Sequence, residues 1–96
     1  MVQTSRSHDT ATIRISGRFD FRCVKSFHAA LDQGCSTWVV DMSAVEYIDS
    51  AALGLLLLLR ERAGNDPARV RIRHANGQPR DVLVMAKFDR MFVLED

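Results

Sequence analysis

Four carboxylates and one serine hydroxyl stand near the ends of the expected strands, and these side chains are the most obvious candidates for chemistry. Paired carboxylates can act as general acid and base, but they need support from a histidine, a lysine or a metal ion. The sequence places no such partner with them, and acidic residues at strand ends more often cap helices or form turns. We therefore expect no enzymatic reaction from this group, which comprises Asp20, Asp41, Glu46, Asp49 and Ser50.

Motifs of known catalytic and ligand-binding sites are absent from the sequence. It contains no Gly-x-Ser-x-Gly nucleophile elbow, no Walker loop, no dinucleotide-binding Gly-x-Gly-x-x-Gly and no His-Glu-x-x-His. The spacing of Cys23 and Cys35 matches neither a redox pair nor a zinc site, so two free thiols are expected. The histidines His8, His28 and His74 are scattered over different elements. We expect no metal and no cofactor.

Ser50 offers a different chemistry, because it directly follows Asp49 at the expected start of a helix. Plain capping is one explanation, since side-chain oxygens there accept hydrogen bonds from unsatisfied backbone N–H groups. Phosphorylation is the other, since a strand-to-helix turn presents the hydroxyl outward and the helix N-terminus favours a phosphate. A phosphate adds about −1.5 to −2 charge, which would change a docking surface while leaving the fold intact. We interpret Ser50 as a phosphoacceptor that switches binding.

Strand and helix patterns alternate along the chain and predict an α/β fold in which crossover helices pack against a four- or five-stranded sheet. A short edge strand is expected near Val2. Further strands are expected at residues 11–16, 37–42, 70–74 and 91–94, and a polar turn follows Met42. Helices are expected from about Val24 to Gly34, from Ser50 to about Ala63, and from about Pro79 to Phe88. The helices are expected on one face of the sheet.

The helix that follows Ser50 is apolar on two sides. At about 100° per residue, one face is broad enough to cover a sheet and is predicted to be core. The opposite row carries Gly54 and Leu57 and is flanked by Leu53. Either a second layer of the domain covers these leucines or they form a docking surface, since exposed apolar clusters usually mark interaction sites. The expected core residues are Ala51, Ala52, Leu55, Leu56 and Leu59.

Length and composition point to one ordinary globular domain spanning residues 1–96. The chain has 96 residues, 47% of them hydrophobic, and a formal net charge of +1. This balance gives no reason to expect nucleic-acid binding, and Arg69, Arg71 and Arg73 alternate with apolar residues as on the solvated face of a strand. The longest apolar run has nine residues, against roughly 18 needed to cross a membrane, so no membrane insertion is expected. With no apolar signal core at its start, we expect a cytoplasmic protein.

Three runs of residues occur together in an order typical of one family. They are the stretch from Val40-Asp41-Met42-Ser43 through Ile48-Asp49-Ser50 to Leu53-Gly54, the run Gly17-Arg18-Phe19-Asp20, and the run Ala86-Lys87-Phe88-Asp89-Arg90-Met91-Phe92. In this combination the sequence resembles the STAS-domain anti-sigma factor antagonists, the bacterial anti-anti-sigma proteins, over nearly its whole length. The resemblance implies a single STAS domain with a mixed four- to five-stranded sheet and helices packed on one face.

The resemblance also implies a partner-switching function. Unphosphorylated chain would bind a histidine-kinase-like serine kinase that doubles as an anti-sigma factor, and so free the target of that kinase. Phosphorylation of Ser50 would abolish binding, and a PP2C-type phosphatase would reverse it. The residues expected to bind the partner are Asp20, Asp49, Ser50, Leu53, Gly54 and Leu57.

Two other functions remain open from the sequence. The same face could dock permanently on an ATPase in a membrane transporter of the lipid or sulfate type, with Ser50 as a cap only. Alternatively, the chain could be a small enzyme or nucleotide-binding module that uses the acidic side chains, which is the third possible function. Copurifying partners would separate the first two, and an effect of nucleotide or metal on the melting temperature would support the third.

Overall fold

Five strands form one mixed sheet in the computed structural model, which describes residues 1–32 and 34–95. β1 runs antiparallel to β2, and the remaining neighbours are parallel. The predicted edge strand near Val2 is confirmed as β1. The strands, which lie in the order of their numbers, are β1 (Val2–Ser7), β2 (Thr10–Phe19), β3 (Thr37–Ile48), β4 (Val70–Arg73) and β5 (Val93–Glu95).

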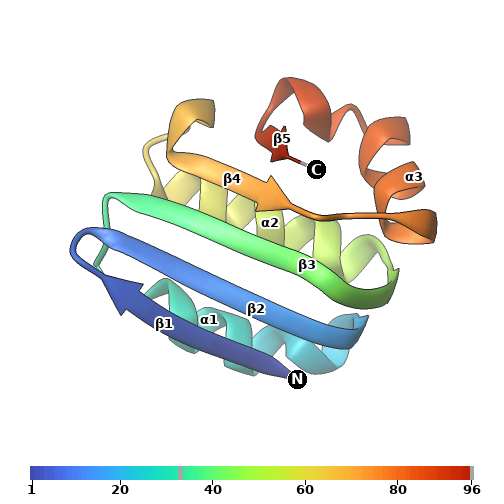
Figure 1. Ribbon diagram of the computed structural model, residues 1–96, viewed down its shortest axis with the longest axis horizontal. Helices are drawn as coiled ribbons and strands as arrows, with labels where there is room; N and C mark the ends of the chain where they lie inside the picture. The colour runs from blue at the N-terminus through green and yellow to red at the C-terminus, as the bar shows by residue number, and fades with distance from the viewer. Residues whose placement is uncertain (33, 96) are drawn as a thin grey trace.

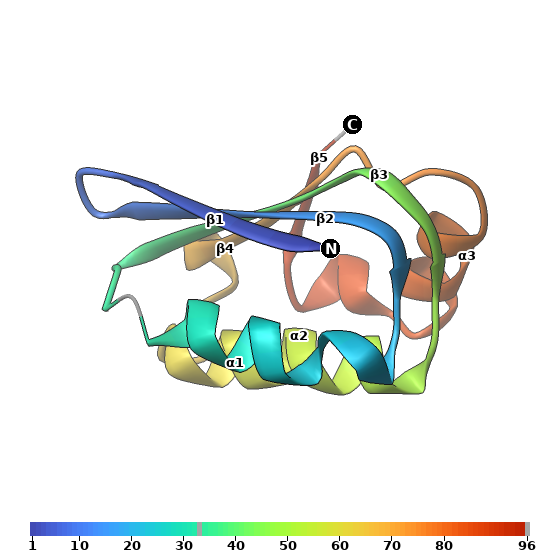
Figure 2. The same cartoon turned by 90° about the horizontal axis from the view of Figure 1, so that it is seen from below.

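Helices connect the parallel strands, because a parallel pair needs a crossover. α1 (Val24–Leu31) follows β2, α2 (Ser50–Arg62) follows β3, and α3 (Gly77–Met85) follows β4. α1 and α2 lie side by side on one face of the sheet (Figure 2), and Figure 1 looks onto the opposite, open face. α3 packs against the last part of β3, beyond the point where β4 stops. The predicted α/β architecture is confirmed, with the third helix at the end of the sheet.

Short 3-10 turns precede three of these elements, at Phe21–Cys23 before α1, Pro67–Arg69 before β4 and Phe88–Arg90 before β5. The first helix ends at Leu31, three residues before the glycine expected to stop it. The last strand begins at Val93, two residues later than expected, because Met91 closes the turn before it.

The core lies between the sheet and the two helices α1 and α2. Leu56 and Leu59 of α2 and Ile13 of β2 are fully buried, and Trp38 of β3 is nearly so. Burial of one such side chain contributes about 1.5–3 kcal/mol, so this layer dominates the stability. The predicted core face of α2 is confirmed except at Ala51, which is half-buried.

β3 is twice as long as the sequence indicates, with 12 residues from Thr37 to Ile48. The polar turn expected after Met42 is therefore wrong, because the strand continues through it. In this half of the strand Met42 is buried, Ser43 and Ala44 are both exposed, and Val45 is buried again. Burial that does not alternate residue by residue gives no strand signal in the sequence.

Two irregularities in the pairing of β2 with β3 cause this loss of alternation. Between Arg14 and Ser16, and again between Gly17 and Arg18, β3 contains one residue more than β2. Gly17 has a φ of +77°, a backbone conformation that residues with a Cβ rarely adopt. Extra residues of this kind bend a strand, and both strands curl toward the helix layer at this end (Figure 2). The curl brings the ends of β2 and β3 to the starts of the two helical segments.

Charged side chains line the open face of the sheet. In β4, Val70 and Ile72 are fully buried, whereas Arg71 and Arg73 are exposed, as predicted for a solvated strand face. Both arginines bind Glu95 of β5, with N···O distances of 2.8 Å from Arg71 and 2.7 Å from Arg73. The hydrogen bonds from Arg73 and Arg71 lower the pKa of the Glu95 carboxyl.

Candidate functional site

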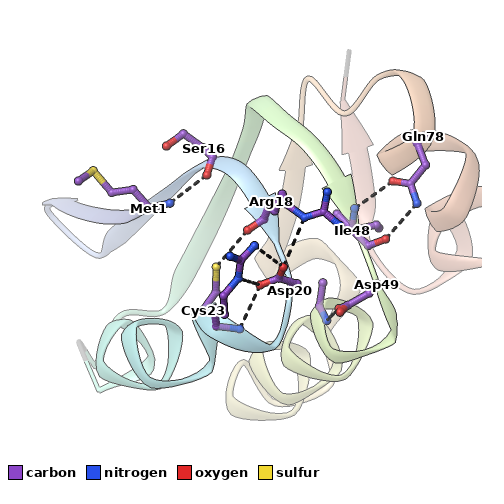
Figure 3. Close-up of polar contacts among 10 residues, drawn as sticks. Met1, Ser16, Arg18, Asp20, Cys23, Ile48, Asp49 and Gln78 are labelled. Carbon is purple, nitrogen blue, oxygen red and sulfur yellow. Dashed lines mark hydrogen bonds and ion pairs between the residues drawn. The ribbon is translucent and has the colours of Figure 1, made fainter.

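The two curled strands end side by side, and each enters a helical segment through an aspartate. Phe19 and Ile48 are paired across β2 and β3, so the next residues, Asp20 and Asp49, are neighbours at one end of the sheet (Figure 3). Asp49 is the N-cap of α2, and its Oδ1 accepts a hydrogen bond from the Ala52 backbone N–H at 3.1 Å. The capping explanation for this pair of residues therefore holds for Asp49.

Asp20 is buried and bound by arginines. Its surface is 5% exposed, and its carboxylate accepts from the backbone N–H, the Nε and the Nη2 of Arg22 at 2.9–3.1 Å. Arg18 lies 3.7 Å from the same carboxylate and stacks on Tyr47, 4.2 Å from the ring centroid. The side-chain hydrogen bond from Arg22 lowers the pKa of Asp20 and, with its other contacts, outweighs burial, which would raise it. Asp20 thus holds the turn after β2 in place instead of offering a free carboxylate.

Acid is expected to weaken the fold through Asp20. Because its folded pKa lies below the ordinary value of 3.8, the ionised carboxylate adds stability that is complete above about pH 4 and is lost as the pH falls through the folded pKa. Asp20→Asn should lower the free energy of unfolding at pH 7 and flatten its decline below about pH 4. Urea denaturation over a pH series measures both effects.

Asp81→Asn, which changes an exposed aspartate on α3, is the matched control for this substitution, and it should leave the free energy of unfolding at pH 7 nearly unchanged. Identical profiles for wild type and Asp20→Asn would mean that the contacts of Asp20 with the arginines add nothing to stability.

Ser50 is an exposed residue. Since Asp49 is the cap, Ser50 occupies the first position of α2, and within the described part of the chain its hydroxyl makes no hydrogen bond. Neither leucine of the expected docking row is sealed by the domain itself: Leu57 is 42% exposed and Leu53 is half-buried. A second layer over this side of α2 is thus not seen among the described residues.

Gly54 lies between these leucines and leaves open space. Apart from its two chain neighbours and the adjacent backbone of α2, a Cβ built on it would meet no heavy atom of the described residues within 4 Å, so packing against the rest of the domain does not require a glycine. Glycine inside a helix is less favourable than alanine by about 1 kcal/mol. A glycine that destabilises α2 and is not needed for packing within the domain is consistent with a surface that another molecule approaches closely.

Phe21 is an exposed apolar residue that the sequence analysis missed. It is 68% exposed, and the turn to which it belongs contacts α2. The signal that could have found it is its position directly after the capping Asp20. We call the group formed by the half-buried Leu53 and the exposed Phe21, Ser50, Gly54 and Leu57 the docking surface; Asp20 and Asp49 cap the two segments that carry it.

Comparison with known proteins identifies the architecture. The family model described as "Mlab, STAS domain" matches residues 2–95. The chain belongs to the STAS family. A STAS-domain containing protein of Pseudomonas aeruginosa (strain UCBPP-PA14) is 38% identical over 84 residues, which cover 84% of this chain and 83% of that protein.

The solved structures that share this STAS fold include anti-sigma factor antagonists. One from Mycobacterium paratuberculosis has a TM-score of 0.84 at 19% identity, covering 99% of this chain and 84% of that one. SpoIIAA in its unphosphorylated form has a TM-score of 0.74 at 20% identity, covering 100% and 87%. SpoIIAA of Bacillus in its phosphorylated form has a TM-score of 0.74 at 18% identity, covering 98% and 90%. At these identities the likeness establishes the fold.

The other two candidate carboxylates, Asp41 and Glu46, do not join Asp20 and Asp49 at the end of the sheet. Asp41 lies in the middle of β3, paired with Arg14 at 3.3 Å, and also accepts from the Ser43 backbone N–H at 2.9 Å. Burial alone would raise the pKa of Asp41, but these bonds together lower it. Glu46 is exposed on β3.

Among the described residues, no helix is long and apolar enough to span a membrane.

Proposed function

We propose that this STAS domain is a non-enzymatic anti-sigma factor antagonist of the partner-switching type. Its unphosphorylated form binds a histidine-kinase-like serine kinase that doubles as an anti-sigma factor, and so releases the target of that kinase. Phosphorylation of Ser50 by the kinase ends the binding, and a PP2C-type phosphatase restores it. The observation that carries the proposal is the exposed Ser50, whose hydroxyl makes no hydrogen bond to the residues that the structure describes, on a helix that also exposes the apolar Leu57.

The position of Ser50 fits a charge switch. A phosphate at the first position of α2 meets the positive end of the helix dipole, so α2 tolerates the modification. The same phosphate adds about −1.5 to −2 charge at the start of the helix that carries the exposed Leu57. Placing that charge in an apolar contact costs several kcal/mol, which changes affinity by orders of magnitude. That a relative of this fold, SpoIIAA, has been solved in phosphorylated and unphosphorylated forms supports the proposal.

Binding itself can be tested at Gly54 without changing any charge. Gly54→Ala fills open space on a helix, so it should raise the free energy of unfolding by about 0.5–1 kcal/mol. The added methyl group stands where a partner would approach closely, so affinity should fall about tenfold or more, as expected for roughly 1.4 kcal/mol of overpacking. The measurements are chemical denaturation and titration with each purified histidine-kinase-like serine kinase of the source organism.

Gly34→Ala changes a glycine outside the docking surface, before β3 at the opposite end of the domain. Its φ of +64° strains an alanine, so this variant should lose stability but keep wild-type affinity. Absence of binding to any such kinase, or equal affinity for wild type and Gly54→Ala, would contradict the proposal. Permanent binding to a transport ATPase, insensitive to charge at position 50, would instead favour a transporter subunit.

A further inference from the structure

One side of β3 has no strand beside it near the docking surface. On the β2 side, pairing continues to Ile48. On the other side β4 pairs with β3 only from Trp38 to Asp41, and within the described residues no strand borders the last seven residues of β3 on this side. The backbone groups that point this way need another partner, because buried N–H and C=O groups are almost always hydrogen-bonded.

The side chain of Gln78 supplies that partner at the very end of the strand. Its Nε2 donates to the Ile48 carbonyl oxygen at 3.0 Å, and its Oε1 accepts from the Ile48 N–H at 2.9 Å (Figure 3). The primary amide thereby binds both backbone groups of one residue, as a neighbouring strand would. Gln78 is the second residue of α3, so these two bonds tie α3 to the end of β3.

Ile48 lies two residues before Ser50, the first residue of the docking surface on α2. It is 1% exposed, and Asp49, which follows it, caps α2 and precedes Ser50. A shift of the Ile48 backbone would therefore move the cap and the start of α2 together. Gln78 itself is exposed, so its substitution removes no core packing and acts through the two hydrogen bonds.

We infer that Gln78 is a positioning residue for the docking surface, which fixes the end of β3 through its amide and thereby sets the place of Asp49 and Ser50. This inference rests on the proposed function, because the surface it positions is the one proposed to bind the kinase. The side-chain chemistry is specific: glutamate can accept from the Ile48 N–H but, when ionised, cannot donate to the carbonyl, and alanine can do neither.

The first test is hydrogen exchange of the Ile48 amide, which does not depend on any partner. In Gln78→Ala this amide loses its acceptor, and we expect its exchange to accelerate at least tenfold relative to the core amides of β2. Gln3→Ala, which changes an exposed glutamine on β1, should leave it unchanged. Unchanged exchange of Ile48 in Gln78→Ala would overturn the inference.

The second test is affinity for the purified kinase that binds wild type. Gln78→Ala should bind about tenfold more weakly, and Gln78→Glu should fall between Gln78→Ala and wild type. Val82→Ala, which trims a half-buried residue of the same helix, controls for mere loss of stability and should bind like wild type. Faster exchange with wild-type affinity in Gln78→Ala would overturn the positioning role alone. No binding by wild type would overturn the proposed function, and the docking role of Gln78 with it.

Discussion

Replacing Ser50 by glutamate is expected to weaken binding of the kinase by at least about tenfold, or ~1.4 kcal/mol, whereas Ser50→Ala keeps wild-type affinity. The carboxylate brings a charge to a surface where Leu57 is 42% exposed and available to an apolar contact. A carboxylate in the first turn of a helix is itself favourable by about 0.3–1 kcal/mol, so the variant should remain folded. Titration of the purified kinase with each variant measures the effect.

Ser5→Glu is the matched control for this charge, because Ser5 is exposed on β1 and pairs with Thr12 in the half of β2 away from the docking surface. It should bind as wild type does. Incubation with kinase and ATP should place one phosphate on Ser50, and Ser50→Ala should take up none. Phosphate on a different residue, or equal affinities of Ser50→Glu and Ser50→Ala, would rule out the charge mechanism.

The start of α2 could be predicted from the sequence because each of its signals is local. Asp49 provides the cap, and the leucines that follow at helical spacing define a buried face that includes Leu56 and Leu59. The same spacing placed Leu57 on the outer side, where the structure exposes it. Local pattern therefore located both the core face of this helix and the surface proposed to bind the partner.

The end of β3, which leads into the site, depends on contacts between distant segments that no local sequence pattern predicts. In the last six residues of β3, buried and exposed side chains do not alternate residue by residue, because the register between β2 and β3 changes twice. Such a change depends on both strands, so the sequence of one strand does not reveal it. The contact of Gln78 with Ile48 joins residues 30 positions apart. The amide of Gln78 binds the backbone of Ile48, and every residue type has the same backbone carbonyl, so the residue type at position 48 does not mark the contact. Such contacts follow from the topology, so they become visible only when the fold is known.

Burial of Asp20 is a third feature that the sequence could not supply. The family resemblance implies that Asp20 contacts the partner, and in the structure its buried carboxylate is bound by Arg22 and lies near Arg18. An Asp-x-Arg spacing is common, and nothing in it distinguishes a capping aspartate from an exposed one. Asp20 is the N-cap of the turn that carries the exposed Phe21, so its contribution to the site is to hold that turn in place.

Two adjacent leucines of α2 should separate stability from binding. Leu56 is fully buried, so Leu56→Ala should lower the free energy of unfolding by about 2–5 kcal/mol. For a domain of this size that corresponds to a fall in Tm of roughly 10 °C or more. Leu57 is 42% exposed, so Leu57→Ala should cost less than about 1 kcal/mol of stability. Thermal and urea denaturation measure both changes.

For affinity to the kinase, Leu57→Ala should have the larger effect and Leu56→Ala the smaller one. Leu57→Ala removes an apolar contact from the docking surface and should weaken the kinase complex about tenfold, in the range of an interface residue that costs more than ~1 kcal/mol. Leu56→Ala, measured well below its own Tm, should bind nearly as wild type does, since its side chain never reaches the surface. If Leu57→Ala instead destabilised the fold as much as Leu56→Ala, or bound with unchanged affinity, the outer side of α2 would be part of the domain's own packing and the partner would have to dock elsewhere.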